Sequence, residues 1–131
     1  MATIELLTDE NATPEACAVF DDIRATRQTD YVNNFWRAMA NDPATMTACW
    51  DRLKQVMGPG SLDPLMKEMI YIAVSVANGC EYCVHSHTAS AAAKGMSAEM
   101  HAELLAVIGL AAQTNALATA MQVPVDDRFK S

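Results

Sequence analysis

Three times in this chain, a helix-capping residue stands directly before a proline. The pairs are Thr13-Pro14, Asp42-Pro43 and Asp63-Pro64. A Thr or Asp side chain can accept hydrogen bonds from the free N–H groups of a first helical turn, and proline suits the first helical position because its missing N–H is not needed there. Each pair therefore predicts the start of a helix, and the repeated pattern predicts an all-α protein.

The segments between these starts have the hydrophobic spacing of helices. After Pro43, apolar residues recur three and four positions apart as far as Met57, and Gly58-Pro59-Gly60 then ends the helix. No alternating strand pattern of useful length is present. We expect about six helices. The first begins at Pro14, and the others cover residues 31–40, 43–57, 64–78, about 80–94 and 97–121. They would form a single-domain helical bundle over residues 1–131, with its core in residues 42–122.

Two of the expected helices are unusually apolar. Residues 64–78 are apolar nearly all round, which is typical of a helix at the centre of a fold. Residues 104–121 carry no charge but include Gln113, Thr114 and Asn115. We therefore interpret them as a buried core helix or a subunit-interface helix, and we expect no membrane span.

The amino-acid composition indicates which kinds of binding partner and which cellular compartment suit this chain. The 131 residues are 51% hydrophobic and can bury a core. The net charge of −7 and the pI of about 4.7 argue against nucleic acid, because few phosphates could be neutralised. The chain has four cysteines and no signal-peptide pattern at its start, which favours a reducing cytoplasm.

Residues 78–88, NGCEYCVHSHT, hold the densest group of reactive side chains. In a helix that begins near Cys80, the side chains of Cys80, Cys83 and His87 share one face, and His85 points elsewhere. Glu68 is the one carboxylate between Pro64 and Asn78. If the two helices pack antiparallel, Glu68 can approach the far side of His87.

This arrangement suits redox chemistry at sulfur. The free N–H groups and dipole of a helix N-terminus, with a neighbouring imidazole, can lower a thiol pKa to about 3.5–7.5. A second cysteine three residues away can then close a disulfide with an oxidised one. We therefore predict a redox dithiol at Cys80 and Cys83, with no cofactor.

Several alternatives remain at this point. Cys80, Cys83 and His87 could bind zinc, with Glu68, a distant residue or water as the fourth ligand. A c-type haem is excluded because Val84, not histidine, follows Cys83. Glu68 could simply pair with Lys67 or lie at the solvent edge. Two further interpretations concern single side chains: Cys17 and Cys49 as core thiols, and Tyr82 as a packing aromatic or a hydrogen-bond donor in the site.

The pattern of Glu68, Cys80-Glu81-Tyr82-Cys83 and His87 resembles the active-site motif of the alkylhydroperoxidase AhpD-like proteins, in the carboxymuconolactone decarboxylase superfamily. The resemblance is best over residues 42–95. It implies an all-helical protein that assembles as a trimer or hexamer and acts as a thiol-dependent peroxidase on hydroperoxides. The reductant would be an unknown thiol or a lipoyl-type donor.

The resemblance also implies a role for each residue. Cys83 would attack the peroxide and pass through a sulfenic acid, while Cys80 would donate a proton and resolve the sulfenic acid. His87 and Glu68 would form the proton relay. Other members have a histidine inside the CxxC, where this chain has Tyr82. The alternative functions are a decarboxylase of small cyclic acids, which would not need the cysteine pair, and a non-catalytic zinc-binding or redox-sensing oligomer.

Overall fold

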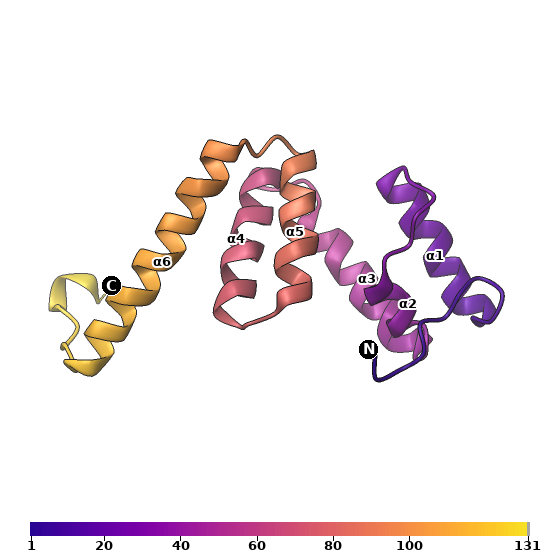
Figure 1. Ribbon diagram of the computed structural model, residues 1–131, viewed down its shortest axis with the longest axis horizontal. Coiled ribbons are helices and arrows are strands. Elements are labelled where there is room, and N and C mark those ends of the chain that lie inside the picture. The colour runs from indigo at the N-terminus through magenta and orange to yellow at the C-terminus, as the bar shows by residue number, and fades with distance from the viewer. Residues whose placement is uncertain (131) are drawn as a thin grey trace. The chain divides into compact units, whose positions relative to one another are not determined.

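The computed structural model describes residues 1–130, which contain helices and no strand. Six α-helices form in the described residues, as predicted, and the short 3-10 helix η1 at Asp127–Phe129 follows them (Figure 1). The α-helices are α1 (Pro14–Arg27), α2 (Asn34–Met39), α3 (Pro43–Met57), α4 (Pro64–Ala77), α5 (Glu81–Ala93) and α6 (Ala98–Ala120). The predicted all-α class is confirmed.

The three cap-and-proline pairs begin α1, α3 and α4 as predicted. Each cap side chain accepts a hydrogen bond from a backbone N–H of the first turn: Thr13 from Ala16 at 3.3 Å, Asp42 from Thr45 at 3.2 Å, and Asp63 from Leu65 at 2.9 Å. The second helix differs from its predicted range because Asn33, in an extended conformation, is its N-cap. It therefore begins at residue 34 instead of residue 31.

The chain divides into two compact units, Met1–Gly58 and Pro59–Ser131. The single domain predicted over residues 1–131 stays a prediction. In the first unit, α1, α2 and α3 enclose an apolar core that includes Phe20, Ile23 and Met46. Trp36 is 1% exposed in this core and packs edge-on against Trp50, with 5.3 Å between the ring centroids.

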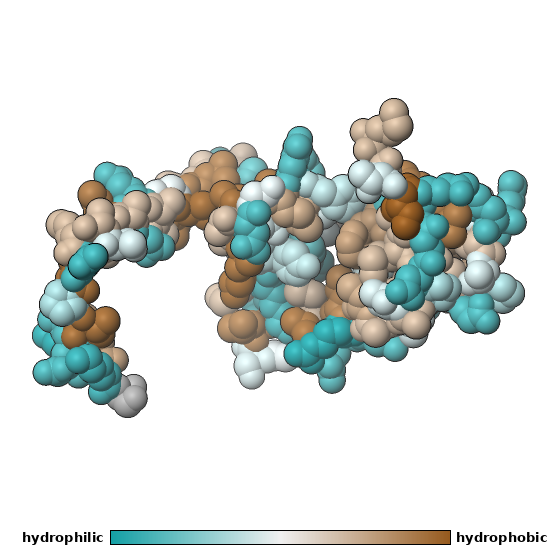
Figure 2. Space-filling view, turned by 90° about the horizontal axis from the view of Figure 1, so that it is seen from below, coloured by the Kyte–Doolittle hydropathy of each residue, from teal (hydrophilic) through white to brown (hydrophobic). Residues whose placement is uncertain are grey.

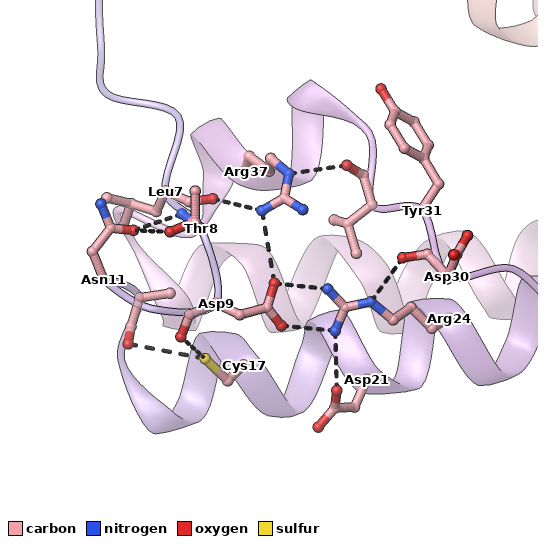
Figure 3. Close-up of polar contacts among 12 residues, drawn as sticks. Leu7, Thr8, Asp9, Asn11, Cys17, Asp21, Arg24, Asp30, Tyr31 and Arg37 are labelled. Carbon is pink, nitrogen blue, oxygen red and sulfur yellow. Dashed lines mark hydrogen bonds and ion pairs between the residues drawn. The ribbon is translucent and has the colours of Figure 1, made fainter.

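Polar contacts hold the segment that precedes α1 (Figure 3). The two carboxylate oxygens of Asp9 accept hydrogen bonds from Arg24, both at 2.7 Å. Arg37 donates to the backbone carbonyl of Leu7 at 3.0 Å. Cys17 is half-buried, and its thiol lies 3.5 Å from the carbonyl of Asp9. The prediction of Cys17 as a core thiol is therefore wrong, because this face of α1 meets the polar backbone of a loop.

In the second unit, α4 and α5 lie side by side as a hairpin (Figure 1). Gly79 makes the turn between them with a φ of +68°, a left-handed conformation that glycine adopts without a steric cost. The small apolar core of this unit consists of Ile72, Ala91 and Met96. Met100, Leu104 and Ile108, on the first half of α6, pack against it.

Within their own unit, α4 and α6 leave much of their apolar surface exposed. On α4, Met66, Ile70 and Val74 are each about half exposed. No residue of α6 is buried, and Figure 2 shows brown apolar side chains at the surface where α6 lies. The predicted central position of α4 and the interpretation of α6 as a buried core helix or a subunit-interface helix therefore stay predictions, since much of each apolar surface has no neighbour within this unit.

One helix within residues 1–130, α6, is long and apolar enough to cross a membrane. This criterion uses length and composition alone. Core and interface helices of soluble proteins satisfy it equally, so it is weak evidence for a span.

Candidate active site

Glu68 and His87 meet between α4 and α5. The Nδ1 atom of His87 lies 2.7 Å from a carboxylate oxygen of Glu68, and Glu68 is 4% exposed although it is charged. The antiparallel hairpin brings the two residues together, because Glu68 lies in the first half of α4 and His87 lies in the second turn of α5. The structure thus brings Glu68 and His87 into contact across the hairpin, as the sequence predicted.

Lys94 makes a second contact with this carboxylate. Its Nζ atom lies 2.9 Å from the other oxygen of Glu68. Burial by itself would raise the pKa of Glu68, but the hydrogen bonds from His87 and Lys94 outweigh it, and the pKa is lowered. Glu68 is therefore a buried carboxylate that stays ionised, instead of an acid at the solvent edge as the alternative interpretation had it.

The orientation of the His87 ring follows from its neighbours. A carboxylate can only accept hydrogen bonds, so the neutral imidazole carries its proton on Nδ1, toward Glu68. The Nε2 atom then has a free lone pair and can accept a proton. Tyr71 stacks on the ring at 3.6 Å between centroids and 20° between planes. The imidazole is thus held both at its edge and on its face.

Cys80 occupies the N-cap position of α5. Its sulfur accepts a hydrogen bond from the backbone N–H of Cys83 at 3.3 Å. The thiol of Cys83 also donates to the Cys80 sulfur, and together these hydrogen bonds lower the pKa of Cys80. Both cysteines are free and half-buried. Cys80 is the more acidic thiol of the two.

Cys83 has the opposite character. Burial raises its pKa to about 11, and the hydrogen bond and negative charge of Cys80 add to the effect. The sequence predicted a lowered thiol pKa at this helix start. In the structure the pKa is lowered at Cys80 but not at Cys83. The reason is local, since a cap sulfur receives the free N–H groups of the first turn, while the side chain of Cys83 lies one turn further on.

The remaining candidates lie around these groups. His85 is exposed on α5, outside the Glu68–His87 contact, as its spacing predicted. Tyr82 lies between the cysteines and is 42% exposed. Within residues 1–130, no three His, Cys, Asp or Glu side chains are grouped so that they could hold a metal ion.

Lys94 and Tyr71 were not predicted from the sequence as residues of the site. Lys94 follows His87 by seven residues, which is two helical turns and therefore the same face of α5. Tyr71 follows Glu68 by three residues on α4. Helical spacing could have put both side chains on the facing surfaces, but it does not reveal which groups they contact.

Comparison with known proteins identifies the family to which this chain belongs. Residues 43–126 match the model of the carboxymuconolactone decarboxylase family. The alkylhydroperoxidase AhpD core from Rhodospirillum rubrum, known from a crystal structure, is 63% identical in sequence to this chain. The match covers 100% of this chain and 98% of the Rhodospirillum rubrum chain, with a TM-score of 0.97. An uncharacterized protein of Cupriavidus necator is 35% identical over 82 residues, which are 63% of this chain and 73% of that protein. The chain belongs to the carboxymuconolactone decarboxylase family and is an AhpD-like member of it.

Proposed function

We propose that the protein is a thiol-dependent peroxidase that reduces hydroperoxides through a Cys80–Cys83 dithiol and disulfide cycle. The observation that carries this proposal is the contact between Glu68 on α4 and His87 on α5, with 2.7 Å between the carboxylate oxygen and Nδ1, because α5 is also the helix whose first turn holds the two cysteines. Similarity to the alkylhydroperoxidase AhpD core supports the same chemistry. Residues 1–131 would act as one domain.

The cycle begins with proton transfer. Nε2 of His87 takes one proton from the dithiol, which leaves a thiolate at Cys80 and an imidazolium paired with Glu68. When the peroxide binds, the Cys83 proton moves to Cys80 along their hydrogen bond, and the Cys83 sulfur attacks the peroxide. A sulfur–oxygen bond forms and the oxygen–oxygen bond breaks. The departing alkoxide takes the proton from Cys80 and leaves as an alcohol.

The second half of the cycle closes the disulfide. The Cys80 thiolate attacks the sulfenic acid of Cys83, so a sulfur–sulfur bond forms and hydroxide leaves. His87 returns its proton to this hydroxide, which becomes water. A thiol or lipoyl-type reductant then supplies two electrons and two protons, and its own thiols become a disulfide. The raised pKa of Cys83 fits this order, because Cys83 keeps its proton until the peroxide binds.

The decisive experiment compares single cysteine variants in a peroxide-consumption assay with dithiothreitol as donor. Cys83→Ser should abolish turnover, whereas Cys17→Ser, a matched change outside the site, should not. Cys80→Ser should stop after one peroxide and leave a sulfenic acid at Cys83, which dimedone labels and mass spectrometry locates. Unchanged turnover in Cys83→Ser would refute the proposal. Labelling at Cys80 in Cys83→Ser would instead reverse the order of the two thiols.

Two other functions make different predictions. A lactone decarboxylase, the activity for which the family is named, would convert a carboxylated lactone even after both cysteines are replaced by serine. A non-catalytic zinc-binding or redox-sensing module would contain stoichiometric zinc or fail to turn over peroxide. We expect no lactone conversion, no bound zinc and two rapidly titrating thiols.

We also propose that the protein is a cytoplasmic homo-oligomer, a trimer or hexamer, without nucleic acid or membrane partners. The exposed apolar side chains of α4 and α6 support this, because such patches on one chain usually mark an interface. Light scattering coupled to size exclusion should give three or six chains. Leu110→Glu on α6 should shift the protein to smaller species, and an unchanged mass in that variant would exclude this part of α6 from the interface.

A further inference from the structure

Lys94 is a charged residue that the proposed cycle does not use, yet it contacts the cycle's buried carboxylate. Glu68 divides its two oxygens between two donors, with His87 at 2.7 Å and Lys94 at 2.9 Å. The Glu68 side chain is 6% exposed, whereas the Lys94 side chain is 40% exposed. Lys94 therefore connects the buried pair to the solvent at the C-terminal end of α5.

We propose that Lys94 is a positioning residue that shares the Glu68 carboxylate with His87, offsets part of its negative charge and thereby sets the pH range in which His87 can accept a proton. The inference rests on the proposed function for its catalytic consequence. Its physical basis is the shared carboxylate, which stands independently of the substrate.

The effect follows from the charge of the carboxylate. A buried carboxylate whose one partner is an imidazole stabilises the imidazolium form, because the two then make an ion pair. An imidazolium has no lone pair left at Nε2 and cannot take a proton from a thiol. A permanent ammonium on the other oxygen neutralises much of that charge. With Lys94 in place, His87 can remain neutral beside a charged Glu68.

Other titratable groups near the pair come from each packed helix. On α5 these are the two cysteines, Glu81 and His85, and on α4 they are Lys67 and Tyr71. Helix α6, which packs on α4, carries Glu99, His101 and Glu103. In the described part of the chain, none of these three is within ion-pair distance of Glu68, His87 or Lys94. Lys94 is thus the cation in direct contact with the carboxylate.

The test is a side-chain NMR titration of His87, assigned by its loss in His87→Asn, in the full-length protein. Lys94→Met should move the midpoint of the His87 titration upward by about one pH unit. This is the lower end of the shift that a charge within hydrogen-bond distance causes, because Lys94 is partly exposed to water. Lys94→Arg should restore the wild-type midpoint. Lys130→Met, the same change at an exposed lysine paired with Asp127, should leave it unchanged.

The pH profile of thiol alkylation by iodoacetamide gives a second readout without peroxide. In Lys94→Met the acid limb of this alkylation profile should move to higher pH, together with the midpoint of the His87 titration. A His87 midpoint that does not move in Lys94→Met would overturn the inference, even if the variant is less stable. A shifted midpoint in a protein that does not consume peroxide would uphold the inference and refute the proposed peroxidase instead.

Discussion

The two units of the chain bury different kinds of side chain. The first unit encloses an apolar and aromatic cluster with Phe20, Trp36 and Trp50. The second buries Ile72, Ala91 and Met96 together with the polar Glu68 and Ser75. Its helices α4 and α6 also leave large apolar side chains exposed, such as Ile70 and Leu110.

This difference separates stability from chemistry. The first unit has an interior like that of an ordinary small domain, in which aromatic packing supplies most of the stabilisation. The second unit contains a buried ion pair, in which the cost of taking the charges out of water offsets much of their attraction, although removal of one partner would be destabilising. The first unit therefore buries mainly apolar and aromatic side chains, whereas the second buries a charged carboxylate beside an imidazole and leaves apolar side chains of α4 and α6 exposed.

The largest effect should come from the aromatic core of the first unit. Trp36→Ala should lower the free energy of unfolding by about 3–5 kcal/mol, because it leaves a cavity among buried side chains. Urea denaturation followed by circular dichroism measures this. Tyr31→Ala, at a residue that is 62% exposed in the same unit, should change the value by about 0.5 kcal/mol or less. Equal effects of the two variants would contradict the assignment of Trp36 to a packed core.

The next effect tests the buried carboxylate of the second unit. Because the pKa of Glu68 is lowered in the folded protein, its ionised form stabilises the fold above the ordinary carboxyl pKa of roughly 4.3, and this contribution disappears as the pH falls through the folded value. Glu68→Gln should therefore cost about 2 kcal/mol at neutral pH and progressively less in acid. Free energies of unfolding measured across the acid range check the sign. Glu99→Gln, at an exposed acid, provides the control, and a cost that grows toward low pH would contradict the lowered pKa.

A smaller effect should follow from loss of the ring stacked on His87. Tyr71→Leu should cost about 1 kcal/mol, the typical value of an aromatic pair, and should broaden or shift the His87 side-chain NMR signals because the imidazole can then rotate. Tyr71→Phe keeps a stacked ring, so its His87 signals should resemble the wild type. If both variants disturb the imidazole equally, the hydroxyl of Tyr71, and not its stacked ring, orients His87.

The smallest effect belongs to the ion pair that holds the N-terminal segment. Arg24→Gln should lower the free energy of unfolding by about 1 kcal/mol at most, because Arg24 and Asp9 are partly exposed and water screens their attraction. Thermal unfolding in low and high salt measures it, and the difference between variant and wild type should shrink with salt. A loss as large as that of Trp36→Ala would mean that the first unit depends on this contact as much as on its core.

The sequence predicted the helices well because their start signals are local. Thr13, Asp42 and Asp63 each bond to a backbone N–H only two or three residues away, so no distant partner is required. Residues 31–33 were the exception. They lie before α2, whose N-cap is Asn33, and no proline follows Asn33 to mark the start of the helix.

The site was predictable to the extent that helical spacing determines it. Spacing placed Cys80, Cys83 and His87 together and set His85 aside, and a lone acid on an apolar helix indicated Glu68 as the partner. The difference between the two thiols was not predictable. It depends on which sulfur receives the first-turn N–H groups and which is more deeply buried.

The sequence by itself determined that the chain is all-helical, where most of its helices begin, and which residues can face one another across the α4–α5 turn, because caps and helical periodicity act over a few residues. Only the tertiary structure decided that Glu68 is shared with Lys94, that Tyr71 stacks on His87, that Cys80 is the more acidic thiol, and that α4 and α6 leave apolar side chains exposed within their unit. These outcomes depend on burial and on contacts between helices, which a periodic pattern permits but does not specify.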